Sequence, residues 1–149
     1  MDIHGSYTFQ APAQAVWDLL VDTTAISSCL PGCETLDPIG ENRYRAVLTL
    51  GIATVTGRYE GTVEMKDLDP PNTYGLEIEG RGKPGFVNGS ATISLTETDG
   101  ITVVTVVGLV QVGGTIARVG QRLFGGVSRM MMDRFFTCLE QKSRGKVDA

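Results

Sequence analysis

Apolar and polar residues alternate along most of the chain, and a period of two predicts β-strands. The first such segment covers residues 2–10, where Ile3, Tyr7 and Phe9 fall on one face and His4 on the other. The other segments that we expect to be strands are Arg43–Leu50, Ala53–Leu68, Tyr74–Gly82, Gly89–Thr96 and Ile101–Val112. The clusters that we expect to form turns are Asp37–Asn42, Asp69–Asn72 and the hairpin pair Asp99-Gly100.

Two short helices are predicted directly after the first strand. Pro12 suits the first turn of a helix that continues through Ala15–Leu20. Asp22 and its two threonines can cap a second helix, and Pro31-Gly32 ends it. The order is therefore strand, two short helices, a series of strands, and one last segment.

That last segment changes to a helical period from about residue 113 onward. Its apolar residues fall on one face at about 100° per residue: Ile116, Val119, Leu123, Val127, Met130, Met131 and Cys138. Five glycines interrupt this pattern, although each glycine inside a helix costs about 1 kcal/mol relative to alanine. Missing side chains leave space, so we interpret the segment as a helix that roofs a cavity.

This order predicts an α+β fold. A long antiparallel sheet needs its apolar face covered, and only the C-terminal helix is long enough to cover it. A curved sheet wrapped around one long C-terminal helix is the helix-grip, or START-like, arrangement. Its interior is usually a tunnel, and the two short helices are expected at the mouth.

The expected cavity residues come mainly from the first short helix, the strands and the last helix. We expect Gly120 to be the position where the helix makes room. The residues predicted to line the cavity or its mouth are Trp17, Leu20, Phe86, Leu109, Val119, Leu123, Val127, Met130 and Met131.

Length and composition indicate one globular domain, which we place at residues 1–144 with a short polar tail at 145–149. The hydrophobic fraction is 42% and the charged fraction 20%, and no apolar run is long enough to span a membrane. The N-terminus has no signal-peptide pattern, so a cytoplasmic location is expected. Three cysteines, an odd number, argue against a disulfide framework.

Charge divides the chain unevenly. Residues 1–112 hold 6 basic and 14 acidic side chains (−8), and residues 113–149 hold 7 basic and 3 acidic ones (+4). The net charge of −4 argues against nucleic acid as a partner. The basic helix is either a solvated face or a docking surface for anionic lipid or an acidic protein. The docking residues would be Arg118, Arg122 and Arg129, with Met132 and Phe136 beside them.

No catalytic set emerges from the sequence. His4 is the only histidine, which excludes a histidine metal cluster. Cys29 and Cys33 could be a redox pair or half of a metal site, but Pro31-Gly32 between them favours a structural turn. We therefore predict neither catalytic nor metal-binding residues. Strand alternation puts the carboxylates of Glu60, Glu64, Glu77 and Glu79 on the polar face, and Arg58 and Arg81 are candidate donors to a ligand head group.

Several strings resemble the carbon monoxide dehydrogenase G-subunit family, and the most specific is Cys-Leu-Pro-Gly-Cys-Glu at Cys29–Glu34. The others are Tyr7–Phe9, Ala11-Pro12, Val16-Trp17, Gly57–Gly61, Leu68–Pro71, Gly85–Ala91, Gln111–Gly114 and Gly120–Leu123. The resemblance covers nearly the whole chain. It implies a START-like fold, association with a molybdenum hydroxylase of the carbon monoxide dehydrogenase type, and a role in bringing that enzyme to the membrane.

Together, the residues and the resemblance suggest a non-enzymatic protein that binds a hydrophobic ligand, a quinone or a lipid, and has no tightly bound cofactor. Two alternatives remain at this point. One is a cyclase- or hydrolase-like enzyme that acts on an apolar substrate, and the other is an adaptor with a solid core. A cavity of measurable volume would distinguish the ligand-binding protein from the adaptor with a solid core.

Overall fold

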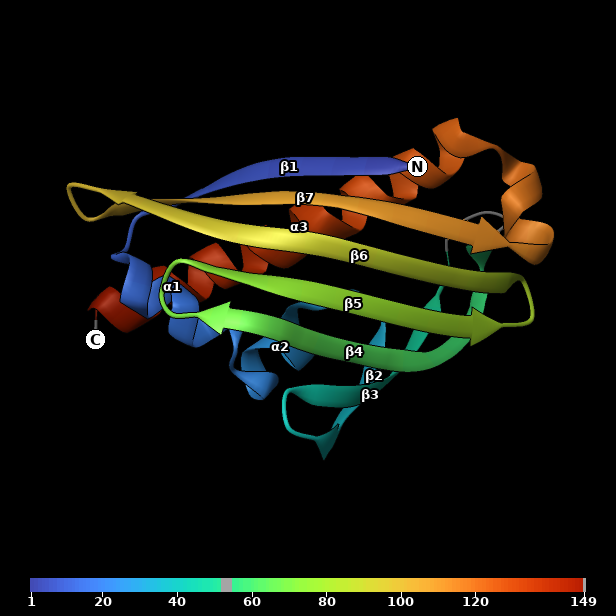
Figure 1. Cartoon of the computed structure of the whole chain (residues 1–149), viewed down its shortest axis with the longest axis horizontal. Coiled ribbons are helices and arrows are strands. Elements are labelled where there is room, and N and C mark those ends of the chain that lie inside the picture. Colours follow the sequence, from blue (N-terminus) through green and yellow to red (C-terminus); the bar gives the residue numbers. More distant parts are fainter. Residues whose placement is uncertain (52–54, 149) are drawn as a thin grey trace.

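The computed structural model describes residues 1–51 and 55–148; the side chains of residues 119, 121 and 146–148 are outside the description. The elements follow the predicted order (Figure 1). They are β1 (Asp2–Phe9), α1 (Ala13–Leu20), α2 (Thr23–Cys29), β2 (Cys33–Gly40), β3 (Arg43–Leu50), β4 (Gly57–Asp69), β5 (Thr73–Gly82), β6 (Gly85–Thr98), β7 (Ile101–Gly113), the short 3-10 helix η2 (Gly114–Val119) and α3 (Gln121–Asp148).

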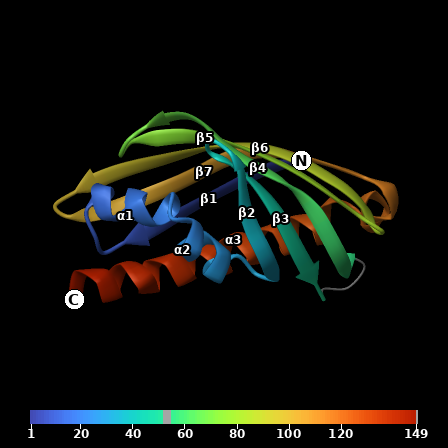
Figure 2. The ribbon, with the colours of Figure 1, turned by 90° about the horizontal axis from the view of Figure 1, so that it is seen from below.

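The seven strands of the described residues form one antiparallel sheet in the order β1-β7-β6-β5-β4-β3-β2. The sheet curves, and α3 lies across its concave side while α1 and α2 close one end (Figure 2). The helix-grip prediction is therefore confirmed. The sharp β6–β7 turn uses Asp99 and Gly100, both with positive φ, as expected for a two-residue hairpin.

The predicted turn at 37–42 is wrong in its extent. Strand β2 continues to Gly40, and only Glu41 and Asn42 separate it from β3. Pro38 suggested a turn because proline cannot donate a backbone hydrogen bond. A strand at the edge of a sheet tolerates proline, and β2 is such a strand, with a register shift between Pro38 and Gly40.

The last helix also begins later than expected. Gly113 ends β7, η2 follows, and Gly120 has a φ of 85° before α3 starts at Gln121. The apolar pattern was helical across this region, but the positive φ at Gly120 interrupts it. Helix α3 then runs to Asp148 and so continues beyond residue 144, where we expected the domain to end and a short tail to begin. The predicted beginning of a strand at Ala53 lies outside the described residues.

The C-terminal half of α3 packs firmly against the sheet and α1. Leu139 is fully buried and Phe136 nearly so, and burying a side chain of this size contributes about 1.5–3 kcal/mol. The Phe136 ring stacks on Tyr7 of β1 at a centroid distance of 4.3 Å. The Tyr7 hydroxyl donates a hydrogen bond to Asp133 Oδ1 at 2.8 Å. Burial and this carboxylate together raise the pKa of Tyr7 to about 12, so the hydroxyl keeps its proton.

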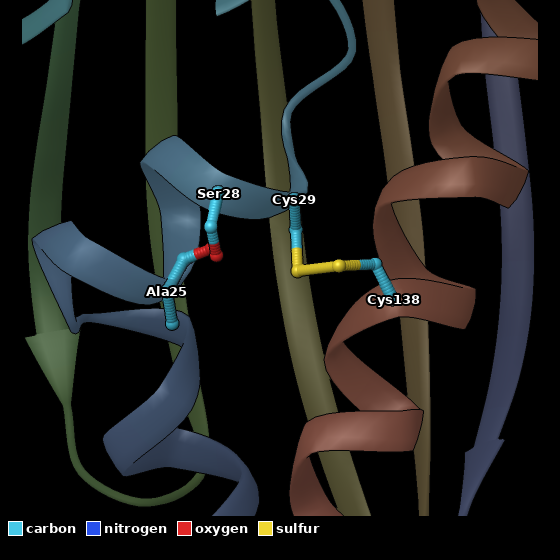
Figure 3. The surroundings of a disulfide bond; sticks show 4 residues. All are labelled: Ala25, Ser28, Cys29 and Cys138. Atoms are coloured by element: carbon cyan, nitrogen blue, oxygen red, sulfur yellow. A yellow bond between two sulfur atoms is a disulfide. The ribbon is translucent and has the colours of Figure 1, made fainter.

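A disulfide joins Cys29, at the end of α2, to Cys138 of α3 (Figure 3). The sequence argument from an odd number of cysteines missed this bond, because spacing along the chain does not show that two residues 109 positions apart meet in space. Cys33 is the free cysteine. The bond holds the second short helix against the long one.

We predict that replacing both Cys29 and Cys138 by alanine lowers the free energy of unfolding by about 2–4 kcal/mol, because the cross-link restricts the unfolded chain. Urea unfolding without reductant measures the change, with Cys33→Ala as the control. Thiol titration of the unfolded wild type should find one reactive cysteine. Three reactive thiols, or equal midpoints for the two variants, would contradict the prediction.

Candidate functional site

An apolar cavity of about 280 Å³ lies between the concave side of the sheet and the N-terminal half of α3. Ile78 borders it and is 40% exposed although it belongs to the inner face, so the cavity opens to the outside. The residues that line it are Leu30, Ala46, Leu48, Leu50, Val55, Tyr59, Glu60, Gly61, Thr62, Val63, Ile78, Glu79, Gly80, Val87, Val110, Ile116, Phe124, Val127, Ser128 and Met131.

Three small residues form the floor of the cavity. The strand register aligns Ala46 of β3 with Gly61 of β4, and Gly61 with Gly80 of β5. A Cβ atom on Gly80 would meet nothing within 4 Å, whereas one on Gly61 would collide with the carbonyl oxygen of Glu79. The floor is therefore nearly bare backbone, about 10 Å wide over two interstrand spacings.

The roof comes from η2 and α3. Ile116 of η2 and Phe124, Val127 and Met131 of α3 supply apolar side chains, and Ser128 supplies a hydroxyl. The four α3 residues lie within about 100° of one another on an ideal helix, which is one side of α3. The cavity is therefore a slot with bare sheet backbone on one side and apolar helix side chains on the other.

The wall carries little polarity. The Tyr59 hydroxyl donates to the backbone oxygen of Val55 at 2.7 Å, and burial raises the pKa of Tyr59. Glu60 borders the cavity through its backbone, because its carboxylate pairs with Arg45 at 3.2 Å and with Arg58 at 3.8 Å on the outer face. Such a wall favours an uncharged ligand.

The predicted cavity residues divide into two groups. Val127 and Met131 border the cavity as expected. Trp17 and Leu20 of α1 are buried in a separate apolar cluster with residues of the sheet and of the C-terminal half of α3, and they do not border the cavity. Met130 is partly buried but does not border the cavity, and the side chain of Val119 lies outside the described residues.

Three more of these residues lie at the surface. Phe86 is 40% exposed, Leu109 57% and Leu123 39%. In β6 and β7 the inner positions are those of Val87 and Val110, so alternation places Phe86 and Leu109 on the outer face. The sequence marked them as apolar, but only strand pairing shows which face they occupy.

The role predicted for Gly120 is wrong. This glycine is exposed, and a Cβ built on it would meet nothing within 4 Å. It permits the backbone change between η2 and α3 instead of making room in the cavity. The room comes from Gly61 and Gly80 in the sheet, which the sequence analysis missed. Alternation with Tyr59 and Ile78 was the available signal, since it puts both glycines on the apolar face.

The predicted docking surface is also changed. Arg118, Arg122 and Arg129 are exposed, but Arg118 belongs to η2, so the angles of one ideal helix do not extend to it. Phe136 is 4% exposed and stacks on Tyr7, and Met132 packs partly buried beside it. Phe136 therefore serves the core and is not available for docking, whereas Met132 is only partly buried and also borders a groove beside Arg122 and Arg129. The neighbours of Phe136 and Met132 on β1 could not be known from the helix pattern alone.

A second, polar groove of about 270 Å³ lies between β1 and α3. It is lined by Arg122, Arg129, His4 and Asp2, with Ile3, Gly125 and Met132. His4 is exposed, as predicted from its strand face. Among the described residues no group of three or more His, Cys, Asp or Glu side chains could hold a metal ion.

The curved sheet, the long covering helix and the apolar cavity between them define a helix-grip domain of the ligand-binding type. The CoxG family model, which describes the G-subunit of carbon monoxide dehydrogenase, matches residues 5–143. The chain therefore belongs to the CoxG family. No curated protein gives a match.

Solved structures agree with this fold. A conserved protein from Geobacillus kaustophilus is 37% identical with a TM-score of 0.95, over 97% of this chain and 96% of that one. The ZhuI aromatase/cyclase from Streptomyces sp. R1128 is 15% identical with a TM-score of 0.70, over 99% and 95% of the two chains. Protein Ms6760 from Mycobacterium smegmatis is 19% identical with a TM-score of 0.68, over 97% and 92%.

We predict that Gly80→Leu fills the cavity and weakens the binding of N-phenyl-1-naphthylamine, a neutral fluorescent probe, at least about tenfold, since overpacking costs 1–3 kcal/mol. Gly120→Leu is the matched control. It should leave the affinity unchanged and lower the free energy of unfolding by about 1–3 kcal/mol, because Gly120 has a φ of 85° and a ψ of 157°, a conformation that is essentially restricted to glycine. Fluorescence titration and thermal unfolding give the two quantities. Equal affinities for both variants would place the probe elsewhere.

Proposed function

We propose that this chain is a non-enzymatic binding protein that carries a hydrophobic ligand, foremost a quinone, for a molybdenum hydroxylase of the carbon monoxide dehydrogenase type. The observation that carries the proposal is the apolar cavity of about 280 Å³ between sheet and α3. Membership in the CoxG family supports the choice of partner.

The size of the cavity suits a quinone ring. An apolar protein cavity of about 150 Å³ can hold benzene, so a volume of about 280 Å³ allows a larger ring system. The open side near Ile78 gives an attached apolar tail a way out. A dehydrogenase in water and an electron acceptor dissolved in the bilayer need such a meeting point.

The two alternatives receive less support. An enzyme of the cyclase or hydrolase type needs a polar group in the cavity with a partner in hydrogen-bond reach. The polar side chains of the described lining that face inward are the hydroxyls of Tyr59 and Ser128, and Tyr59 is already engaged by Val55. The open volume argues against an adaptor with a solid core.

We predict that 2-methyl-1,4-naphthoquinone binds with one molecule per chain, competes with N-phenyl-1-naphthylamine, and is lost in Gly80→Leu, because that side chain occupies the slot. Native mass spectrometry gives the stoichiometry and fluorescence displacement the competition. The Gly120→Leu variant controls for the added leucine. A wild type that binds neither this quinone nor a lipid would refute the carrier function.

We further propose a peripheral contact with anionic lipid at the polar groove. No helix among the described residues is long and apolar enough to cross a membrane. Arg122 and Arg129 border the groove and lie about 20° apart on an ideal helix. Within the described part of the chain neither forms an ion pair, so both are available to lipid phosphates. This contact would place the protein in the cytoplasm, on the inner face of the membrane.

We predict that the Arg122→Gln/Arg129→Gln variant binds vesicles of phosphatidylcholine with 30% phosphatidylglycerol about tenfold or more weakly, since each cation near the surface contributes about 1 kcal/mol. Arg134→Gln/Lys142→Gln removes the same charge at least about 120° away on α3 and is the control. Co-sedimentation at rising salt measures binding, which screening should weaken. If both double variants lost vesicle binding equally, net charge and not the groove would explain the loss. If the protein bound the purified dehydrogenase but not the vesicles, the groove would instead be a protein-docking surface.

A further inference from the structure

The hydroxyl of Ser128 occupies a distinctive place in the cavity. Ser128 borders the cavity on the same side of α3 as Phe124, Val127 and Met131. A serine within a helix often bonds to a backbone oxygen of the preceding turn. Here the Ser128 hydroxyl has no hydrogen-bond partner among the described residues.

This hydroxyl is also accessible. No buried side-chain nitrogen or oxygen in the described part of the chain lacks a partner. Because the Ser128 hydroxyl has none, it is not fully buried, and Ser128 is one of the residues that border the cavity. It is therefore a free donor and acceptor at an apolar wall.

Opposite Ser128 the slot offers no charge. Ala46, Gly61 and Gly80 contribute bare backbone. The two acidic residues of the lining, Glu60 and Glu79, occupy outward positions between Gly61, Ile78 and Gly80 and are exposed. Removing a carboxylate or ammonium group from water here would be costly, because no opposite charge compensates it.

We propose that Ser128 selects neutral, flat-ring ligands that carry a carbonyl-type acceptor, by donating a hydrogen bond to that acceptor. The inference rests on the proposed carrier function and specifies its ligand class. A hydrocarbon of the same shape fits the slot but leaves the hydroxyl unpaired, and a ring with a carboxylate loses its hydration without a partner. The role of Ser128 is thus discrimination among ligands of similar size.

Three probes with related two-ring skeletons test this: 2-methyl-1,4-naphthoquinone, 2-methylnaphthalene and 2-naphthoate. The wild type should bind the quinone best and the carboxylate worst. In Ser128→Ala the affinity for the quinone should fall about fivefold, as expected for one hydrogen bond, while the affinity for 2-methylnaphthalene stays the same or rises. Isothermal titration calorimetry measures all three, and Thr137→Ala, at an exposed position on α3, is the control.

The outcomes separate this inference from the carrier function. A wild type that binds none of the three probes refutes the carrier function itself. Binding of the quinone that is equally strong in wild type and Ser128→Ala refutes the role of Ser128 alone. Equal losses for quinone and hydrocarbon in Ser128→Ala also refute it, because they would show a change in packing and not in hydrogen bonding.

Discussion

The packing of α3 against the concave side of the sheet is the interaction on which the other features depend. Seven antiparallel strands leave one apolar face uncovered, and burial of that face supplies the main driving force for folding. Only α3 is long enough to cover it. The helix does so unequally along its length. Its C-terminal half is anchored by Leu139 and Phe136, and its N-terminal half stands over the cavity.

The two halves of α3 therefore differ in role: the C-terminal half stabilises the fold, and the N-terminal half covers the cavity. The anchored half includes the Phe136–Tyr7 stack, the Tyr7–Asp133 hydrogen bond and the Cys29–Cys138 disulfide. These contacts hold the helix in place without filling the space near its other end. The disulfide also fixes the end of α2, and the next residue, Leu30, borders the cavity. Reducing compartments usually keep cysteines as free thiols. Whether the Cys29–Cys138 bond is formed therefore depends on the compartment in which the protein works.

The two faces of the sheet have separate tasks. On the outer face of β3, β4 and β5, charged side chains form ion pairs such as Arg45–Glu60 and Lys66–Glu77. Exposed pairs of this kind contribute little to stability, about 0–1 kcal/mol. They keep the acidic residues turned away from the cavity, so the inner face of the same strands remains apolar. By its polarity alone, such a face favours a neutral ligand over a charged one.

The order of the elements, the helix-grip fold and the apolar character of the interior could all be predicted from the amino-acid sequence, because periodicity and turn residues act locally. The sequence also placed Val127 and Met131 on the correct side of the last helix. The position of the cavity could not be predicted in this way, because it depends on how the strands pair. Glycines in the helix pattern suggested space at Gly120. The strand register instead places Gly61 beside Gly80, and the missing side chains leave the space above the sheet. The disulfide, the burial of Phe136 against Tyr7 and the exposure of Leu109 were hidden for the same reason: each depends on a contact between segments far apart in the chain, which local patterns do not record.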